Sequence, residues 1–193
     1  MPDSLGFLCL VVLIYSAGLR VRELFVSRAH QSTLAMQGYK RKDGFGSYCN
    51  MVLLHLTFFI AVAVELFTLQ TLAIFPIQIV AFCFFLFSQV LRFYALQSLG
   101  KYWNTNIMSA HGTSQFVQQG PYQFIRHPNY LAVILEFISI PLIGGCWRSA
   151  LVYSIWNGVV LRYRIKEEEQ ELFKISGYRE VMGPKKRFIP GIV

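Results

Sequence analysis

The chain has 193 residues, of which 54% are hydrophobic and only 15% are charged, and its mean hydropathy is +0.44. This composition excludes a typical soluble globule and favours one integral membrane domain over residues 1–193. The net charge of +8 does not indicate nucleic-acid binding, because the basic residues border the apolar stretches, where membrane topology and anionic lipid headgroups account for them.

Residues 1–98 contain three apolar stretches that are long enough to cross a bilayer. These predicted spans are Leu5–Phe25, Met51–Leu72 and Leu72–Leu96, and the last two meet at a short turn at or just before Pro76. The first stretch has neither a basic leading segment nor a small-residue cleavage site, so we expect a retained membrane helix and not a signal peptide.

A polar connection, Ser27–Tyr48, follows the first span, and within it we expect a short helix at Ser32–Gln37. Residues 99–193 begin with a second polar connection and then carry two shorter apolar stretches, Tyr130–Ile143 and Trp147–Leu161, which are separated by two glycines. Their lengths predict a tight helical hairpin. The helical pattern continues past the second stretch as a charged helix that ends at Gly177.

The sequence thus predicts an all-α protein with about five membrane spans and a cytoplasmic C-terminal helix. Basic residues concentrate after the first, third and fifth spans, whereas the other two connections hold only Arg148. The positive-inside rule then places the N-terminus outside, and the two long connections and the C-terminal segment in the cytoplasm. Both charged motifs described next lie on that cytoplasmic face.

The first motif is Arg126-His127-Pro128, at the start of the fourth span. Proline suits the first turn of a helix, because the missing N–H has no intrahelical partner there. Arg126 and His127 then lie just before a helix N-terminus, whose free amides attract anions. The alternative is that Arg126 is an interfacial anchor and His127 a helix cap.

The second motif is Arg164 to Leu172, in which Arg164 and Glu168 are four residues apart and share one helix face. The alternative is a solvated helix with weak surface pairs. Glu167, Glu168 and Glu169 repel one another, so at least one is expected to be free to bind a ligand, such as a ribose diol. The spacing does not choose among the three.

His55 and Glu65 are ionisable residues in the second span, which by default suggests function, although both could lie near the span's ends. Trp103, Tyr122 and Tyr130 suit either an interfacial belt or stacking on a purine or a sulfonium. The four cysteines lack zinc-ligand spacing, so we expect no metal site and mostly buried thiols.

These residues together resemble the isoprenylcysteine carboxyl methyltransferase (ICMT) family, in its short prokaryotic form. The family's RHPxY motif, its Arg-x-x-x-Glu-Glu-x-x-Leu helix and its terminal basic-hydrophobic-Pro segment match, in order, Arg126 to Tyr130, then Arg164, Glu168, Glu169 and Leu172, then Arg187 to Pro190. Leu99-Gly100, Trp103, Gly120 and Tyr122 also fit. The order over half the chain is more specific than any one motif.

The resemblance implies an integral membrane enzyme that uses S-adenosylmethionine. The cofactor-binding residues it implies are Tyr122, Arg126, His127, Pro128, Tyr130, Glu168 and Glu169. Arg164 would orient an anionic acceptor, and His127 would be a second catalytic residue. We add His55 and Trp103 as candidate substrate-binding residues.

For the acceptor, we expect the carboxylate of a prenylcysteine-like lipid, which is ionised at neutral pH and needs an arginine but no base. A lipidic phenol or pyrone is the alternative acceptor, for which His127 or His55 would serve as the base. The partners are then membrane lipids and a lipophilic substrate that enters laterally. A small transporter or structural membrane protein is disfavoured, because the polar residues gather at one membrane face.

Overall fold

The computed structural model describes residues 4–68, 74–109 and 115–189. Within these ranges the chain is helical, and it has isolated β-bridges but no strand. Its helices are α1 (Ser4–Met36), α2 (Phe45–Thr68), α3 (Phe75–Leu99), η1 (Gly100–Tyr102), η2 (Gly120–Gln123), α4 (Pro128–Ile143), α5 (Trp147–Leu172) and α6 (Tyr178–Met182). The all-α prediction is confirmed for this part of the chain.

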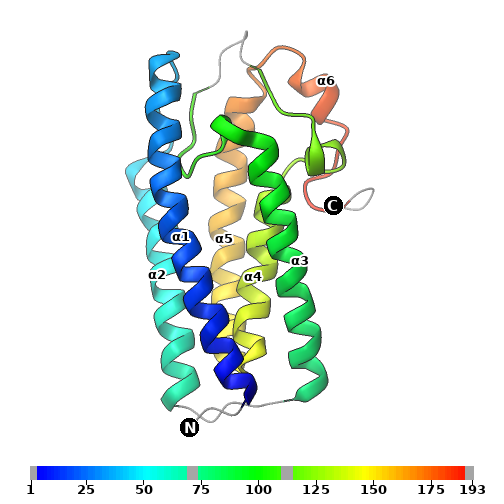
Figure 1. The fold of residues 1–193 in the computed structure, drawn as a ribbon. Coiled ribbons are helices and arrows are strands. Elements are labelled where there is room, and N and C mark those ends of the chain that lie inside the picture. The colour runs from blue at the N-terminus through cyan, green and yellow to red at the C-terminus, as the bar shows by residue number, and fades with distance from the viewer. Residues whose placement is uncertain (1–3, 69–73, 110–114, 190–193) are drawn as a thin grey trace.

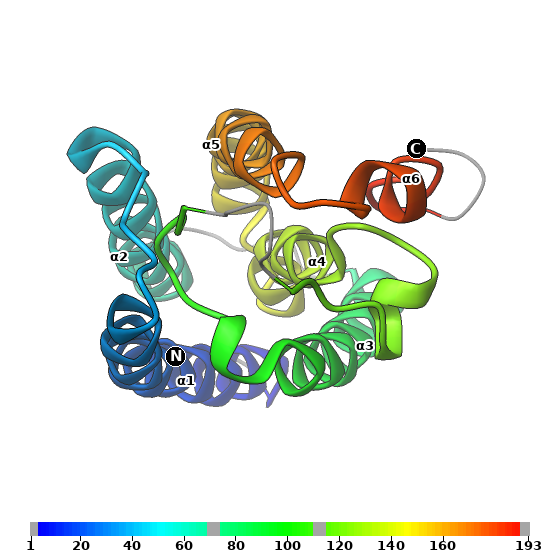
Figure 2. The same ribbon diagram turned by 90° about the horizontal axis from the view of Figure 1, so that it is seen from above.

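The five long helices run side by side, and η1, η2 and α6 gather at one end of the bundle (Figure 1). Seen from that end, α4 lies near the middle, and it packs against α1, α3 and α5 (Figure 2). A central helix must be apolar on several sides, and α4 accordingly buries Ala132, Val133, Phe137, Ile140 and Ile143. The bundle therefore holds both charged motifs at the same end as the small helices.

Three of the described helices, α1, α2 and α3, are long and apolar enough to cross a membrane, while α4 is a shorter apolar helix. This confirms the three long apolar helices predicted for residues 1–98. The boundary predicted at Leu72 lies outside the described residues. Pro76 occupies the first turn of α3, where its missing N–H costs nothing.

Two predicted helix boundaries are wrong. The helix expected at Ser32–Gln37 is the last part of α1, which continues unbroken from the first span to Met36. No glycine or proline occurs between Gly18 and Gly38, and the φ of 87° at Gly38 suits the turn that ends the helix. At the other end of the chain, α5 stops at Leu172, and Gly177, with φ of 77°, instead precedes α6.

The predicted hairpin is formed by α4 and α5, which Gly144 and Gly145 connect. Gly145 has a φ of 69°, which only glycine adopts readily. At Gly144 a Cβ atom would lie 2.8 Å from Cys9 Sγ, so the turn packs directly on α1. Beyond the hairpin, α5 continues without a break into the charged motif, as predicted.

Glu65 lies at the opposite end of the bundle from the charged motifs, where it caps α5. Its carboxylate accepts the backbone N–H of Arg148 at 3.1 Å and that of Ser149 at 2.8 Å, and also the Ser149 hydroxyl at 2.6 Å. A carboxylate at a helix N-terminus satisfies free amides and interacts favourably with the helix dipole. Glu65 therefore has a structural role and does not belong to the same site as His55.

We predict that Glu65→Ala destabilises the protein by about 2 kcal/mol, because three hydrogen bonds to a buried carboxylate are lost. Thermal unfolding in detergent measures this effect. Glu180→Gln, which removes the same charge from an exposed side chain of α6, is the control and leaves the unfolding temperature unchanged. An equal effect of the two substitutions would refute the capping role.

Candidate active site

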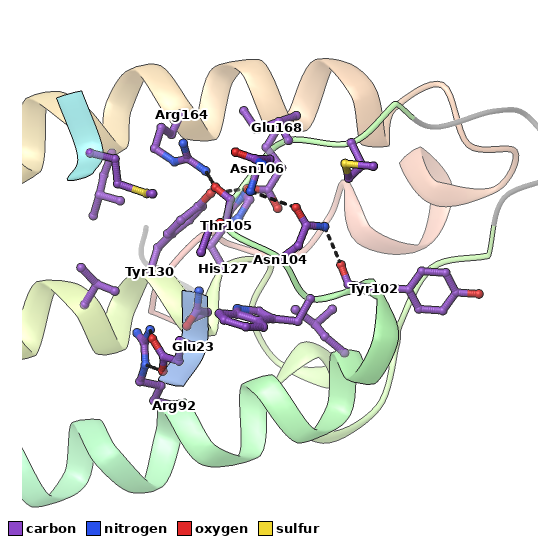
Figure 3. A pocket seen from close by; sticks show the side chains of 18 of the residues that line it. Glu23, Arg92, Tyr102, Asn104, Thr105, Asn106, His127, Tyr130, Arg164 and Glu168 are labelled. Carbon is purple, nitrogen blue, oxygen red and sulfur yellow. Dashed lines mark hydrogen bonds and ion pairs between the residues drawn. The ribbon is translucent and has the colours of Figure 1, made fainter. Parts of the chain in front are cut away.

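A cavity of about 530 Å³ opens within the bundle at the end that carries both motifs. Side chains of α1, α2, α3, α4 and α5 line it. Residues 102–109 contribute a further, mostly polar side. Figure 3 shows the side chains that converge there, among them Tyr130, Arg164 and Glu168. This volume is in the range of small-molecule binding sites.

The start of α4 is held by the C-terminal segment. The backbone N–H of Arg126 donates to the carbonyl of Lys186 at 2.9 Å, and that of His127 donates to Arg187 at 3.0 Å. Pro128 then begins the helix. His127 is the N-cap residue of α4, as the alternative interpretation had it, but its imidazole makes no capping bond and instead contacts Glu169 at 3.1 Å.

Glu169 is the centre of this arrangement. Its carboxylate lies 3.0 Å from Arg126 Nη1 and accepts hydrogen bonds from Arg187 at 3.1 Å and 2.6 Å, in addition to the His127 contact. Burial alone would raise the pKa of Glu169, but the hydrogen bonds from His127 and Arg187 and the charge of Arg126 lower it to about 2. Glu169 does not line the cavity, so it joins α4, α5 and the C-terminal segment.

Glu168, the residue before Glu169, lines the cavity. Arg164, four residues before Glu168 on the same helix, also lines it. The Tyr130 hydroxyl donates a hydrogen bond to Glu168, and Arg164 Nη2 donates to the Thr105 carbonyl at 2.8 Å. Arg164 is only 3% exposed, and its Nε and Nη1 have no partner among the described residues. Burial alone would lower the pKa of Arg164, but Tyr130 and Glu168 raise it, so the guanidinium stays cationic.

Each of the three neighbouring carboxylates, Glu167, Glu168 and Glu169, has a hydrogen-bond partner, so none of them is free, contrary to the expectation. Glu167 accepts from the Ser47 hydroxyl at 3.1 Å, and the other two have the partners described above. Of the three, only Glu168 lines the cavity. It is thus the carboxylate best placed to exchange its present partner for a ligand.

The remaining predicted site residues also divide into those that line the cavity and those that do not. Tyr122, Arg126, His127, Tyr130, Trp103 and His55 all line the cavity, whereas Pro128 does not. The His127 and Tyr130 rings stack with centroids 5.4 Å apart. His55 Nδ1 lies 2.9 Å from the Met51 carbonyl, and its ring meets Phe137 edge-on. Among the residues that the structure describes, no group of His, Cys, Asp and Glu suits a metal ion.

A cluster of charges deeper in the bundle was not predicted from the sequence. Arg20 and Glu23 of α1, Arg92 of α3 and Glu136 of α4 form a chain of ion pairs. Arg20, Glu23 and Arg92 line the cavity. Single charges inside the apolar runs QVLRFYAL and AVILEFIS were the available signal, because such residues are costly unless they are paired.

The fold and cavity define an all-helical protein with long apolar helices and a buried, charged binding site. The model of the isoprenylcysteine carboxyl methyltransferase (ICMT) family matches residues 79–174. The uncharacterized protein YpbQ of Bacillus subtilis (strain 168) is 34% identical over 158 residues, which cover 81% of this chain and 92% of that protein. The chain belongs to the ICMT family of membrane methyltransferases, as the resemblance predicted.

The solved structure of the eukaryotic intramembrane Ras methyltransferase ICMT shares the fold, with a TM-score of 0.54 and 19% sequence identity. The match covers 68% of this chain but only 50% of that one. Its helical arrangement supports the integral membrane character indicated by α1, α2 and α3.

We predict that Glu169→Gln accelerates tryptic cleavage after Lys185 and Lys186 about tenfold. Loss of charge-assisted hydrogen bonds worth at least about 1.5 kcal/mol releases the C-terminal segment by that factor. Glu167→Gln removes the same charge nearby, and we expect it to leave the cleavage rate unchanged. Equal rates in wild type and Glu169→Gln would contradict the proposed anchor.

The same variant tests the lowered pKa. The carboxyl titrates near 4.5 in the unfolded chain and at about 2 in the folded protein. Its contribution to stability is therefore complete above the unfolded value and is lost as the pH falls toward the folded value. The difference in unfolding temperature between wild type and Glu169→Gln should narrow from about pH 5 to about pH 3.

Proposed function

We propose that the chain is an S-adenosylmethionine-dependent O-methyltransferase that methylates the carboxylate of a prenylcysteine-like lipid. The observation that carries the proposal is the buried guanidinium of Arg164: the residue lines the cavity, and two of its nitrogens have no hydrogen-bond partner among the residues that the structure describes. Buried donors are nearly always paired in proteins, so an unpaired arginine favours an anionic ligand. Membership of the ICMT family supports the reaction type.

The residues at one end of the cavity fit the cofactor. Glu168 is an acceptor for ribose hydroxyls, and the aromatic rings of Tyr122 and Tyr130 suit a purine or a sulfonium. Asn106 and Asn129 also line the cavity, and their side-chain oxygens are buried and lack partners among the described residues, so these two residues are further candidates to accept hydrogen bonds from the cofactor's amino groups. His127, Arg126, Pro128 and Glu169 act mainly by holding this end together.

When bound, S-adenosylmethionine supplies a methyl group on a sulfonium; transfer breaks one carbon–sulfur bond, forms one carbon–oxygen bond and moves no proton if the acceptor is a carboxylate. The chain's own residues then have to align the acceptor and exclude water. Arg164 contributes to the alignment of the acceptor through its positive charge and its planar set of N–H donors. Residues 102–109 line the cavity on one side.

The cavity also has a route for an apolar tail. Val21 of α1 and Val52, Leu56 and Ile60 of α2 line it. The exposed fractions of these residues are 55%, 37%, 58% and 55%, respectively. A binding site whose apolar wall reaches the lipid-facing surface between two helices suits a prenyl or alkyl chain that enters from the bilayer.

A second acceptor class is favoured by His55. Since the Met51 carbonyl can only accept, the contact at 2.9 Å makes Nδ1 the N–H donor and leaves the lone pair on Nε2. A neutral imidazole in the cavity wall could remove the proton of a lipidic phenol or of a hydroxypyrone. His127 is less suited to this task, because its Nε2 contacts Glu169.

The membrane arrangement is part of the proposal. We place five spans in the bilayer, with the N-terminus outside and the cavity end, which carries the basic residues, in the cytoplasm. A transporter or structural protein is a poorer fit, because the polar cavity lies at one end of the bundle.

We predict that the detergent-solubilised protein binds S-adenosylhomocysteine. Glu168→Ala and His127→Ala should each weaken this binding at least about tenfold, since each removes charge-assisted or packed contacts at the cofactor end. Arg164→Lys should lower kcat about 100-fold, because a point charge does not replace a planar fork. Isothermal titration calorimetry and a labelled-methyl assay measure the two effects.

The control for Arg164→Lys is its own affinity for S-adenosylhomocysteine, which should stay within about threefold of wild type. Absence of binding to the wild-type protein would refute the methyltransferase proposal. Unchanged affinity in both alanine variants would refute the site assignment alone. Labelled transfer to a prenylcysteine analogue or to an alkylresorcinol decides between the two acceptor classes.

The sidedness is tested by labelling single cysteines in a variant whose four native cysteines are alanine. Arg148→Cys, at the α4–α5 turn, should react with a membrane-impermeant maleimide in intact cells. Lys101→Cys, at the cavity end, should react only after permeabilisation. The opposite pattern would refute the orientation, and both side chains are exposed in the fold.

A further inference from the structure

The buried charges of α1, α3 and α4 form one electrically neutral network. Arg92 Nε and Nη2 donate to the two oxygens of Glu23 at 2.7 Å and 2.5 Å, and Arg20 Nη1 donates to Glu23 at 2.9 Å. Arg20 also donates to Glu136, whose other oxygen accepts from Gln89 at 2.8 Å. Two guanidinium groups thus balance two carboxylates.

Most of these hydrogen bonds join one helix to another, which explains their presence. One nitrogen, Nη1 of Arg92, takes no part in them. The Arg92 side chain is 7% exposed, and its Nη1 has no hydrogen-bond partner in the described part of the chain. A guanidinium has five N–H donors in a fixed plane, and a site that served only to join helices would pair those on Nη1 as well. The unpaired nitrogen therefore points to a ligand.

The network is also part of the cavity wall. Arg20, Glu23 and Arg92 line the same cavity as Arg164. Figure 3 shows Arg92 and Glu23 on the α3 side of the cavity, whereas Arg164 extends from α5. Two buried arginines from different helices thus line one cavity. An acceptor with a single oxygen-bearing group would satisfy Arg164 and leave Arg92 unpaired.

We propose that Arg92, held by Glu23, is a second recognition site for the methyl acceptor, and that it donates a hydrogen bond to an oxygen separate from the one that is methylated. This inference rests on the proposed function and narrows its substrate class. The acceptor is a lipid whose polar head carries two oxygen-bearing groups. The second oxygen belongs to an amide carbonyl beside a carboxylate, or to a second ring oxygen beside a phenolic hydroxyl.

Two matched pairs of acceptors test the requirement for a second oxygen. N-acetyl-S-farnesylcysteine and S-farnesyl-3-mercaptopropionate share the carboxylate and the tail, but only the first has an amide carbonyl. 5-Pentadecylresorcinol and 3-pentadecylphenol differ by one ring oxygen. In whichever pair is methylated, we expect the wild-type kcat/KM to favour the two-oxygen member at least about tenfold.

The test variant is Glu23→Gln with Arg92→Gln, which removes both charges of one ion pair and leaves Arg20 paired with Glu136. We expect it to reduce the preference between the two acceptors to within about threefold, with its affinity for S-adenosylhomocysteine unchanged. Gln89→Leu is the matched control. It alters the same network at a residue outside the cavity wall, so the preference should stay at the wild-type level.

Equal kcat/KM values for both members of a pair in the wild-type protein would overturn the inference. It would also be overturned if the double variant lost activity equally on both acceptors, since that result indicates a purely structural role. Thermal unfolding shows whether the variant is folded; if it is not, the wild-type comparison still decides. Failure of the wild-type protein to bind S-adenosylhomocysteine is separate and refutes the proposed function itself.

Discussion

The ion pairs of Glu169 are the interaction on which the site depends. One carboxylate contacts Arg126 and His127 from the start of α4 and Arg187 from the C-terminal segment. Arg126, His127 and Arg187 are 43, 42 and 18 residues away from Glu169 in the sequence. The α4–α5 hairpin brings the first two to Glu169, and the C-terminal segment brings the third. Glu168 and Arg164 can then face the cavity, since the neighbouring carboxylate neutralises the basic residues behind them.

A second electrostatic constraint acts within the apolar part of the bundle. Unpaired charges are costly in apolar surroundings, and α1, α3 and α4 each bring charge into the apolar interior of the bundle. The network of Arg20, Glu23, Arg92 and Glu136 meets this constraint by mutual pairing. Glu65 meets it by a different means, because it accepts hydrogen bonds from the first turn of α5. Every buried carboxylate named here thus has a specific donor.

Local patterns in the sequence predicted much of this protein. Hydropathy identified α1, α2, α3 and the hairpin, and helical spacing placed Arg164 and Glu168 on one face. Neither hydropathy nor helical spacing could identify Glu169 as an anchor. The partners of Glu169 are distant in the sequence, and the three consecutive glutamates have the same local pattern. The pairing of Arg20 with Glu136, separated by 116 residues, was invisible for the same reason. The length of α1 was underestimated because polarity was taken as the end of a helix.

The unbroken course of α1 has a mechanical consequence. Its 33 residues extend about 50 Å at 1.5 Å per residue, well beyond a hydrocarbon layer of about 30 Å. Beyond the first predicted span, Ser27 accepts a hydrogen bond from the Thr105 backbone at 2.8 Å, and His30 contacts the Trp103 carbonyl at 2.6 Å. This part of the cavity wall is therefore fastened to a long apolar helix. Because a helix meets a mismatch with the hydrocarbon layer partly by tilting, a change of lipid that tilts α1 also moves the segment that is hydrogen-bonded to it.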